Sequence, residues 1–241
     1  MAWWENWFGE EYLDLYPHRD LDSARREAAF ALERLPRGGV TPLLDLCCGS
    51  GRHALRFAEA GVFPVGLDYS APQLALARHR NPRLRLVRGD MRRLPFPDAH
   101  FRAVVNFFTS FGYFLAEADN RAVVGEIARV LSRGGRFLCD TFGLDHVLGR
   151  LVAEESRVTE DREYRITRRW NQTSRRIEKE IEVRRGGTVE MFRESVRGYS
   201  CGELTGLLQS AGLAVEAAWG DFDGCPAGAD SPRLIVLARK S

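Results

Sequence analysis

The sequence predicts an α/β protein, with a mostly parallel sheet between helices and an antiparallel β-ribbon inserted late in the chain. Short apolar runs alternate with segments of helical periodicity between residues 43 and 140. This alternation is typical of a parallel sheet covered by helices on both faces. In the segment 157–199 apolar residues recur at every second position, as at Tyr164, Ile166 and Trp170, which indicates antiparallel strands. The 241 residues fit one domain.

The elements of the α/β part follow in a regular order. A cap region over residues 1–36 comes first, and its apolar positions recur at helical spacing from Leu21 to Leu35 until Pro36 ends the pattern. The next apolar run ends in a glycine turn that leads into a helix, and this unit then repeats. Strands are expected at 43–46, 63–67, 84–88, 103–107 and 136–140, with helices at 52–60, 71–80 and 120–131.

The ribbon and the end of the chain complete the predicted fold. Turn residues divide the ribbon into three expected strands, at 158–170, 175–184 and 189–197. An isolated ribbon of this length is only marginally stable, so its apolar face must pack on another part of the protein. A helix at 201–211 and a strand pair at 215–219 and 234–238 are expected to follow.

Composition excludes several classes of protein. The formal net charge is +2, and the basic and acidic residues of the ribbon are nearly balanced, so a nucleic-acid partner is not expected. The five cysteines include no C-x-x-C pair, which argues against a disulfide framework and a zinc site. No apolar run is long enough for a bilayer, and the first residues lack a secretion signal. We therefore expect a cytoplasmic protein that does not bind a membrane.

A glycine-rich loop follows the first predicted strand, with the sequence Cys47-Cys48-Gly49-Ser50-Gly51. This loop alone also fits a dinucleotide fingerprint. Acidic residues at the strand ends indicate whether the loop binds a dinucleotide or another ligand that contains adenosine. Asp68 ends the second strand, where a carboxylate can accept both ribose hydroxyl hydrogens of an adenosine. Asp45 stands where a dehydrogenase would hold a pyrophosphate, which it would repel. The Asp45 carboxylate is compatible with a cationic ligand. Asp90, after the third strand, can accept a hydrogen bond from adenine N6.

The joint pattern resembles the class I S-adenosylmethionine-dependent methyltransferase family. The resemblance rests on Leu44–Gly51, Gly66–Ser70, Gly89–Met91 and Leu131–Gly135. It implies a Rossmann-like seven-stranded sheet whose C-terminal strand is antiparallel, and S-adenosylmethionine as cofactor. It further implies that the acid matching Asp68 binds the ribose, that the pair matching Asp90 and Met91 holds adenine, and that Asp45 acts near the ammonium group. The remaining expected cofactor-binding residues are Cys47, Gly49, Gly51, Tyr69 and Asn106.

The cap segment from Tyr12 to Asp20 resembles that of small-molecule methyltransferases such as the sugar N-methyltransferases. The resemblance implies that Tyr16 lines the methyl-transfer centre and that Arg19 pairs with the donor carboxylate. Aromatic residues after the fourth strand leave Tyr113 as an expected pocket residue. Tyr16 and Tyr113 are thus the candidate catalytic residues, and no residue is singled out as a general base among His18, His53, His146 and Tyr113.

The expected function is methyl transfer to a small-molecule N or O acceptor. Two alternatives stay open: a module that binds S-adenosylmethionine without turnover, and a dinucleotide-dependent oxidoreductase. The ribbon interrupts the α/β order where the acceptor must arrive, which makes it a lid or the surface of a homodimer. The aromatic cluster Trp3, Trp4, Trp7 and Phe8 is expected to be an apolar flap that packs on the domain.

Overall fold

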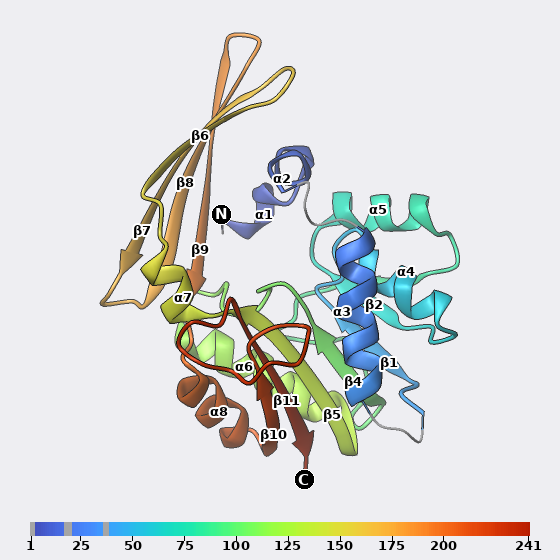
Figure 1. Cartoon of the computed structure of the whole chain (residues 1–241). Helices are drawn as coiled ribbons and strands as arrows, with labels where there is room; N and C mark the ends of the chain where they lie inside the picture. Colours follow the sequence, from blue (N-terminus) through green and yellow to red (C-terminus); the bar gives the residue numbers. More distant parts are fainter. Residues whose placement is uncertain (1–2, 17–20, 36–38) are drawn as a thin grey trace.

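The computed structural model of the chain describes residues 3–16, 21–35 and 39–241. These residues form an α/β sheet with its helices and a second, antiparallel sheet that projects from one end of it (Figure 1). The first two helices lie between the projecting sheet and the helices of the α/β part. In the described part of the chain, no helix is long and apolar enough to cross a membrane.

The main sheet has seven strands in the order β10-β11-β5-β4-β1-β2-β3. Strand β11 runs antiparallel to both of its neighbours, β5 and β10, whereas the other neighbouring pairs are parallel. The predicted Rossmann-like sheet with an antiparallel C-terminal strand is therefore confirmed. Its strands are β1 Leu43–Leu46, β2 Val65–Asp68, β3 Arg85–Arg88, β4 Phe101–Asn106, β5 Leu131–Phe142, β10 Leu213–Trp219 and β11 Arg233–Lys240.

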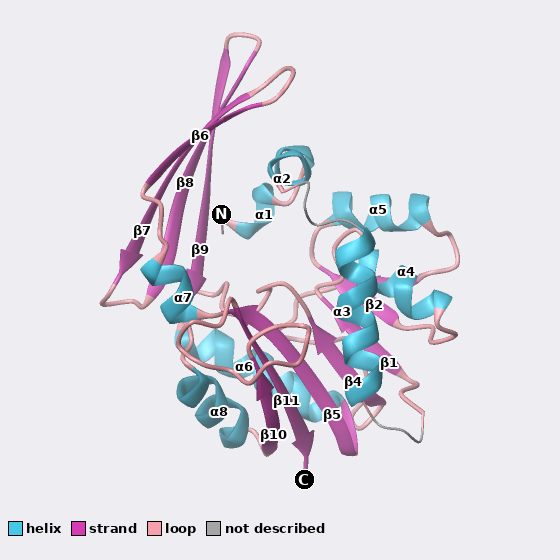
Figure 2. Cartoon of the chain, viewed as in Figure 1, coloured by secondary structure: helices cyan, strands magenta, loops and turns pink. Residues whose placement is uncertain are grey.

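Helices cover both faces of this sheet (Figure 2). Neighbouring strand residues point to opposite faces, so Val104 belongs to one buried apolar cluster and Val105 to the other. The first cluster includes Ile127 and Leu204 from α6 and α8, and the second includes Phe57 from α4. The helices are α3 Leu21–Arg34, α4 Arg52–Glu59, α5 Ala71–Arg80, α6 Glu117–Val130, α7 Leu144–Gly149 and α8 Cys201–Ser210.

One boundary of the α/β part differs from the prediction. The fifth strand was expected at 136–140 after a helix at 120–131, but the helix ends at Val130 and β5 already begins at Leu131. Gly134 has a φ of +74°, and the pairing register of β4 with β5 shifts between Phe101 and Ala103. Gly134 therefore accommodates an irregular start of β5.

The ribbon has four strands, so the prediction of three was wrong. A turn closed by a hydrogen bond of 2.9 Å from Thr159 N to Arg162 O interrupts the single strand expected at 158–170. The residues before that turn pair back on the strand that follows it. The strand before that turn was not predicted from the sequence, because it is mostly exposed and its apolar residues do not alternate with polar ones. The strands are β6 Glu154–Val158, β7 Glu163–Asn171, β8 Arg176–Arg185 and β9 Thr188–Arg197.

The cap contains two short helices, α1 Trp4–Trp7 and α2 Glu10–Leu15, which helical periodicity did not predict because each is too short. Trp7 and Leu15 form a buried cluster with Tyr164 and Ile166 of the ribbon. The apolar face of the ribbon thus packs on the cap, which agrees with the expectation that it packs on another part of the protein. Trp170 is not part of this cluster.

Candidate functional site

The loop after β1 is shaped by residues in the left-handed backbone region. Cys47, Gly49 and Gly51 have φ values of +61°, +51° and +73°. At Gly51 a Cβ atom would also lie 3.0 Å from the Ala77 side chain, so this glycine lets α4 begin close to α5. Leu67 O accepts a hydrogen bond of 3.0 Å from Cys48 N. The loop is thereby fastened to the end of β2.

Asp68 lies at the end of β2 and faces this loop. Its Oδ2 accepts a hydrogen bond of 2.8 Å from Gly49 N, and its Oδ1 accepts one of 2.8 Å from Ser70 N. Burial raises the pKa of Asp68, while these backbone donors act to lower it. Each carboxylate oxygen has room for a further donor, since an ionised carboxylate offers about four lone-pair sites.

Asp90 and Met91 follow β3. The Asp90 carboxylate forms an ion pair of 2.7 Å with Arg92 and accepts a hydrogen bond of 2.8 Å from Arg92 N. A ligand amine at Asp90 would therefore share this carboxylate with Arg92. Met91 is buried, and its sulfur lies 3.6 Å from Cys47 Sγ.

Asp45 is buried in the middle of the parallel pairs that β1 forms with β2 and β4. Its Oδ2 accepts no hydrogen bond from the described residues, and the Ala54 amide is its backbone donor. Burial raises the pKa of Asp45 to about 7, with the Asp68 carboxylate acting in the same direction and Arg52 opposing it. A buried carboxylate oxygen without a donor favours a cationic ligand nearby.

Two cavities flank the glycine loop. The strand-end cavity has a volume of about 100 Å³, and the loop cavity on the other side has about 530 Å³. Both are lined by Cys47 and Gly49 and by Tyr12 of the cap, so they lie next to each other. Six predicted cofactor-binding residues line the strand-end cavity, namely Cys47, Gly49, Asp68, Tyr69, Asp90 and Met91.

The remaining predicted residues lie behind these walls or elsewhere. Gly51 and Asp45 line neither cavity. Asn106 is also absent from both linings and donates a hydrogen bond of 2.8 Å to Leu46 O, which braces the end of β1. Arg19 lies outside the described residues, as does His18.

The cap covers the strand-end cavity with aromatic side chains. Trp4 and Phe8 line it, and Phe8 O accepts hydrogen bonds from Ser70 Oγ at 3.2 Å and from Gln73 Nε2 at 3.3 Å. The cap is thus fastened on one side to the end of β2 and the start of α5. The predicted apolar flap therefore packs partly on the domain and partly, through Trp7, on the ribbon.

Tyr16 lines the loop cavity and connects the cap to the ribbon. Its hydroxyl donates to Glu194 at 2.9 Å and accepts from Lys179 Nζ at 2.9 Å. Trp7 Nε1 donates to the same Glu194 carboxylate at 2.6 Å. Burial raises the pKa of Tyr16 well above its ordinary value, and Glu194 adds to this effect. The Tyr16 hydroxyl therefore stays protonated and holds the cap on the ribbon.

Tyr113 lies where the strand-end cavity meets a third cavity, the ribbon chamber. This chamber has a volume of about 220 Å³ and lies between the cap, the ribbon and the turn after β4. Tyr12 and Tyr113 line both the chamber and the strand-end cavity. The Phe8 ring stacks on Tyr113 with 5.7 Å between centroids. Other chamber residues are Phe108, Thr109, Ile177, Lys179, Glu194 and Arg233.

His53 is the one candidate base that lines a cavity beside the glycine loop, among the histidines that the structure describes. It is buried in α4, lies 2.5 Å from Glu27 and stacks on Phe107 with 4.1 Å between centroids. Burial lowers the pKa of His53 to about 4, with Arg52 acting in the same direction. His146 is half-buried, and its Nδ1 lies 2.8 Å from Asp230 O.

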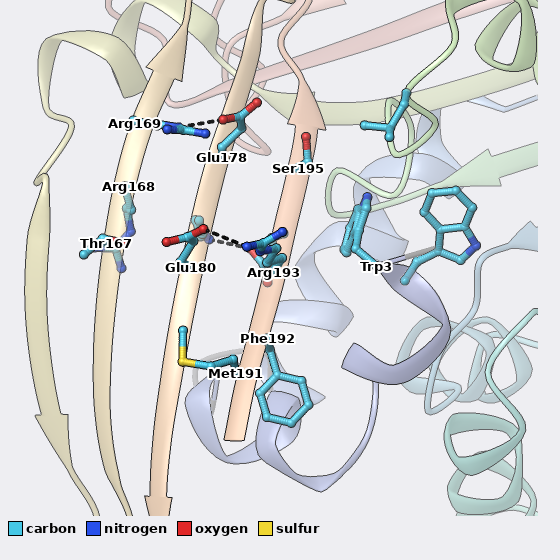
Figure 3. Close-up of a pocket in the computed structure, with 14 residues that line it drawn as sticks. Trp3, Thr167, Arg168, Arg169, Glu178, Glu180, Met191, Phe192, Arg193 and Ser195 are labelled. Atoms are coloured by element: carbon cyan, nitrogen blue, oxygen red, sulfur yellow. Dashed lines mark hydrogen bonds and ion pairs between the residues drawn. The ribbon is translucent and has the colours of Figure 1, made fainter. Parts of the chain in front are cut away.

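A larger groove lies on the ribbon and has a volume of about 680 Å³ (Figure 3). Two ion pairs lie in its lining, between Arg169 and Glu178 at 2.7 Å and between Arg193 and Glu180 at 3.4 Å. These pairs are largely exposed, which is typical of a solvated sheet face. The groove carries none of the acidic strand ends, so the cavities around the glycine loop are the better candidate site.

Comparisons with known proteins address the same part of the chain. A family model described as a methyltransferase domain matches residues 43–135. A demethylmenaquinone methyltransferase of Thermus thermophilus is 39% identical over 125 residues, which are 49% of this chain and 53% of that protein. Over residues 43–135, from β1 to the start of β5, the chain is therefore similar to methyltransferase domains.

A glycine/sarcosine N-methyltransferase of Halorhodospira halochloris is also similar to this chain. It is 34% identical over 153 residues, which are 58% of this chain and 57% of that protein. The chain spans about half the length of the curated relatives that it matches.

Solved methyltransferase structures match the chain over nearly its whole length. The amino pentose methyltransferase CalS10 of Micromonospora echinaspora is 26% identical, with a TM-score of 0.70 and coverage of 98% of this chain and 99% of that one. The methyltransferase CcbJ of Streptomyces caelestis has a TM-score of 0.81 at 19% identity and 98% coverage of both chains. The fold shared with them therefore extends beyond residues 43–135.

Several residues around the candidate site were not predicted. Phe8 and Tyr12 line the strand-end cavity. In the sequence, only the high frequency of aromatic residues in the cap pointed to them. Glu194 joins cap and ribbon, and no local pattern distinguishes it from the other ribbon carboxylates. Asp140 could have been predicted as a site residue, because it is a fourth acidic residue near the carboxyl end of a parallel strand.

Proposed function

We propose that this protein transfers a methyl group from S-adenosylmethionine to a nitrogen or oxygen atom of a small molecule. The observation that carries the proposal is the buried Asp45 carboxylate, whose Oδ2 has no donor among the described residues, behind a glycine loop at the strand ends. The names of similar proteins support it, since they include demethylmenaquinone and glycine/sarcosine methyltransferases.

The residues around the loop fit the proposed donor. We assign the ribose to Asp68, whose two oxygens each hold one backbone donor and keep lone pairs for two hydroxyls. Adenine is assigned to Asp90 and Met91, next to the exposed ring of Tyr69. The methionine part is assigned to the loop from Cys47 to Gly51, with Asn106 behind it. Arg19 remains the proposed partner of the donor carboxylate.

The same pocket argues against a dinucleotide cofactor. A pyrophosphate on this loop would bring two negative charges near Asp45, which lies close enough to Asp68 for their charges to interact. Arg52, whose charge acts on Asp45, is already paired with Glu27 at 3.0 Å. A sulfonium and an ammonium group instead reduce the repulsion between the carboxylates.

The acceptor is proposed to enter the ribbon chamber. When bound, S-adenosylmethionine supplies a methyl group on a sulfur that is already activated as a leaving group. The protein's task is then to align the acceptor and exclude water, for which well-oriented cases provide about 7 to 11 kcal/mol. Tyr12 and Tyr113 line the boundary between the donor cavity and the chamber. A volume of about 220 Å³ favours an acceptor group of the size of one ring.

A dedicated base is not required for an amine acceptor. The His53 pKa of about 4 leaves its imidazole neutral at pH 7, and Glu27 holds one of its nitrogens. The Tyr16 hydroxyl is protonated and bonded to Glu194. We therefore propose that Tyr16 and Tyr113 shape the site rather than exchange protons, and that the amine enters as its neutral form.

The cap and the ribbon are proposed to act as a lid. They share one buried cluster around Trp7 and Tyr164, and the cap reaches the donor cavity through Phe8. A homodimer through the ribbon is the other expected role, and the exposed apolar residues Val158 of β6 and Val189 and Met191 of β9 are available for it. Light scattering over a concentration series distinguishes a monomeric lid from a dimer surface.

Methyl transfer from a labelled donor to a panel of small amines, phenols and alcohols tests the proposed function. Calorimetry with S-adenosylhomocysteine and with NAD runs in parallel. We expect binding of the first ligand only, with turnover of at least one acceptor. Asp68→Ala should lose both binding of S-adenosylhomocysteine and methyl transfer. Asp98→Ala, at an exposed aspartate paired with Arg129, should keep both. Binding without any turnover would favour a non-catalytic binding module.

A further inference from the structure

The turn that follows β4 has an unusual backbone. Phe108 and Thr109 have φ values of +60° and +61°, so two consecutive residues other than glycine are left-handed. This region is unfavourable for most L-residues and especially for a β-branched one such as Thr109. Such backbone persists only where surrounding contacts impose it, and it concentrates at functional sites.

A buried ion pair imposes this backbone. Asp140 of β5 is fully buried, and its Oδ2 accepts a hydrogen bond of 2.8 Å from Phe108 N while its backbone O accepts one of 2.9 Å from Thr109 N. Arg233 of β11 donates to both carboxylate oxygens of Asp140 at 2.8 Å and to Thr109 Oγ1 at 3.3 Å. Both backbone N–H groups of the turn are therefore bound to one residue, which Arg233 in turn holds in place.

The Phe108 ring is also held by cations. The Arg233 guanidinium carbon lies 5.1 Å from its centroid, and that of Arg52 lies 5.3 Å from it. Both distances fall within the range of cation–π interactions. The turn thus has a fixed backbone and a fixed aromatic side chain.

The turn lies between the loop cavity, where the donor is proposed to bind, and the ribbon chamber, where the acceptor is proposed to bind. Phe108 lines the loop cavity together with Cys47 and Gly49, and it also lines the ribbon chamber. Thr109 and Arg233 line the ribbon chamber as well. A change of the turn would therefore move a wall of the proposed acceptor site, while Asp68 ends β2 and Asp90 follows β3, so both would stay in place.

We infer that Asp140 and Arg233 are positioning residues for methyl transfer, which hold Phe108 and Thr109 in the left-handed conformation and thereby fix the acceptor wall. This inference rests on the proposed function. Without the pair, the turn relaxes toward ordinary backbone angles, and the acceptor loses alignment with the donor. Misplacement of this kind lowers turnover strongly while donor affinity is preserved.

Rescue by glycine is the sharpest test. Arg233→Met removes the fork that holds Asp140, and we expect kcat to fall by about tenfold to a hundredfold while the Kd for S-adenosylhomocysteine stays close to that of the wild type. Thr109→Gly adopts a positive φ without steric cost, so adding it to Arg233→Met should recover much of the lost kcat. Arg239→Met on the same strand, at an exposed arginine paired with Glu216, is the matched control and should change neither constant.

Crystal structures of the variants provide a readout that does not depend on activity. We expect Phe108 and Thr109 to leave the left-handed region in Arg233→Met and to return to it in the double variant. If Arg233→Met does not fold, Arg233→Lys replaces it, because a lysine cannot form the two parallel bonds. An unchanged turn in the variant, or a double variant no more active than Arg233→Met, would overturn the inference. Wild-type protein inactive on every acceptor would instead refute the proposed function, and the structures would still decide the role of the pair.

Discussion

Asp45 is the residue at which donor binding and folding are expected to oppose each other. Its carboxylate is 1% exposed and has a pKa of about 7, against an ordinary value of 3.8. In the protein without ligand, about half of the Asp45 side chains are therefore protonated at pH 7. The proposed donor is cationic near this residue and binds the ionised form. Binding at pH 6 must then release a proton.

The size of the effect follows from the pKa of Asp45. If only the ionised form binds, the affinity at pH 6 is about 11-fold below its limit at high pH, which equals about 1.4 kcal/mol, and at pH 8 it is within about 10% of that limit. Asp45→Asn removes the titrating group. We expect this variant to bind the donor about 1.5 to 3 kcal/mol more weakly at pH 8, the usual range for a bond to a charged group, with no dependence on pH between 6 and 8.

The effect on folding has the opposite sign. The pKa of Asp45 is higher in the folded chain than in the unfolded one, so the unfolded chain loses its proton first as the pH rises. Stability is therefore lost between about pH 3.8 and pH 7, by up to about 4 kcal/mol. Asp45→Asn avoids this loss and should melt at a higher temperature than the wild type at pH 8, although it binds the donor more weakly.

Isothermal titration with S-adenosylmethionine at pH 6, 7 and 8, in two buffers of different ionisation enthalpy, measures the affinity and the released protons. Thermal melting at the same pH values measures the stability. Asp98→Asn is the control, because Asp98 is exposed, pairs with Arg129 and lines neither cavity beside the glycine loop. Wild-type affinity that does not change between pH 6 and pH 8, or full affinity in Asp45→Asn, would refute the reasoning.

Three further predictions concern other parts of the site. Asp68→Ala should weaken donor binding by about 1 to 3 kcal/mol without changing the melting temperature, and calorimetry on the folded variant measures it. The lowered pKa of His53 means that the unfolded chain binds its proton first, so as the pH falls from about 6.5 to about 4 the wild type should lose up to about 3 kcal/mol of stability. Urea unfolding of wild type and His53→Gln across that range tests this, and a constant difference between them would contradict it. Tyr16→Phe removes the hydroxyl that bridges Lys179 and Glu194, so turnover should fall more than stability, and limited proteolysis should cut the cap faster even with S-adenosylhomocysteine bound; equal protection would mean that the bridge does not hold the cap.

The sequence was sufficient for features that are local or that follow from the rules of parallel sheets. Glycine is needed where the chain turns with positive φ, so the loop around Gly49 and Gly51 was visible without coordinates. The acidic residues Asp45 and Asp68 could be brought together because neighbouring parallel strands end at the same edge. Periodicity predicted the five helices of two turns or more (α3, α4, α5, α6 and α8) and the seven strands of the main sheet, since elements of this length repeat their pattern. It did not predict the shorter helices α1, α2 and α7.

Only the tertiary structure decided which distant surfaces meet. Periodicity indicated that the ribbon has an apolar face, but apolar contact is not directional, and nothing local identified the cap around Trp7 as its partner. Glu194 and Trp7 are separated by 187 positions, and Asp140 and Arg233 by 93. The left-handed backbone at Phe108 and Thr109 contradicts the local preference of both residues, so it exists because the long-range pair imposes it. Contacts between separate strands determine such features, and a single sequence records the residues but not their pairing.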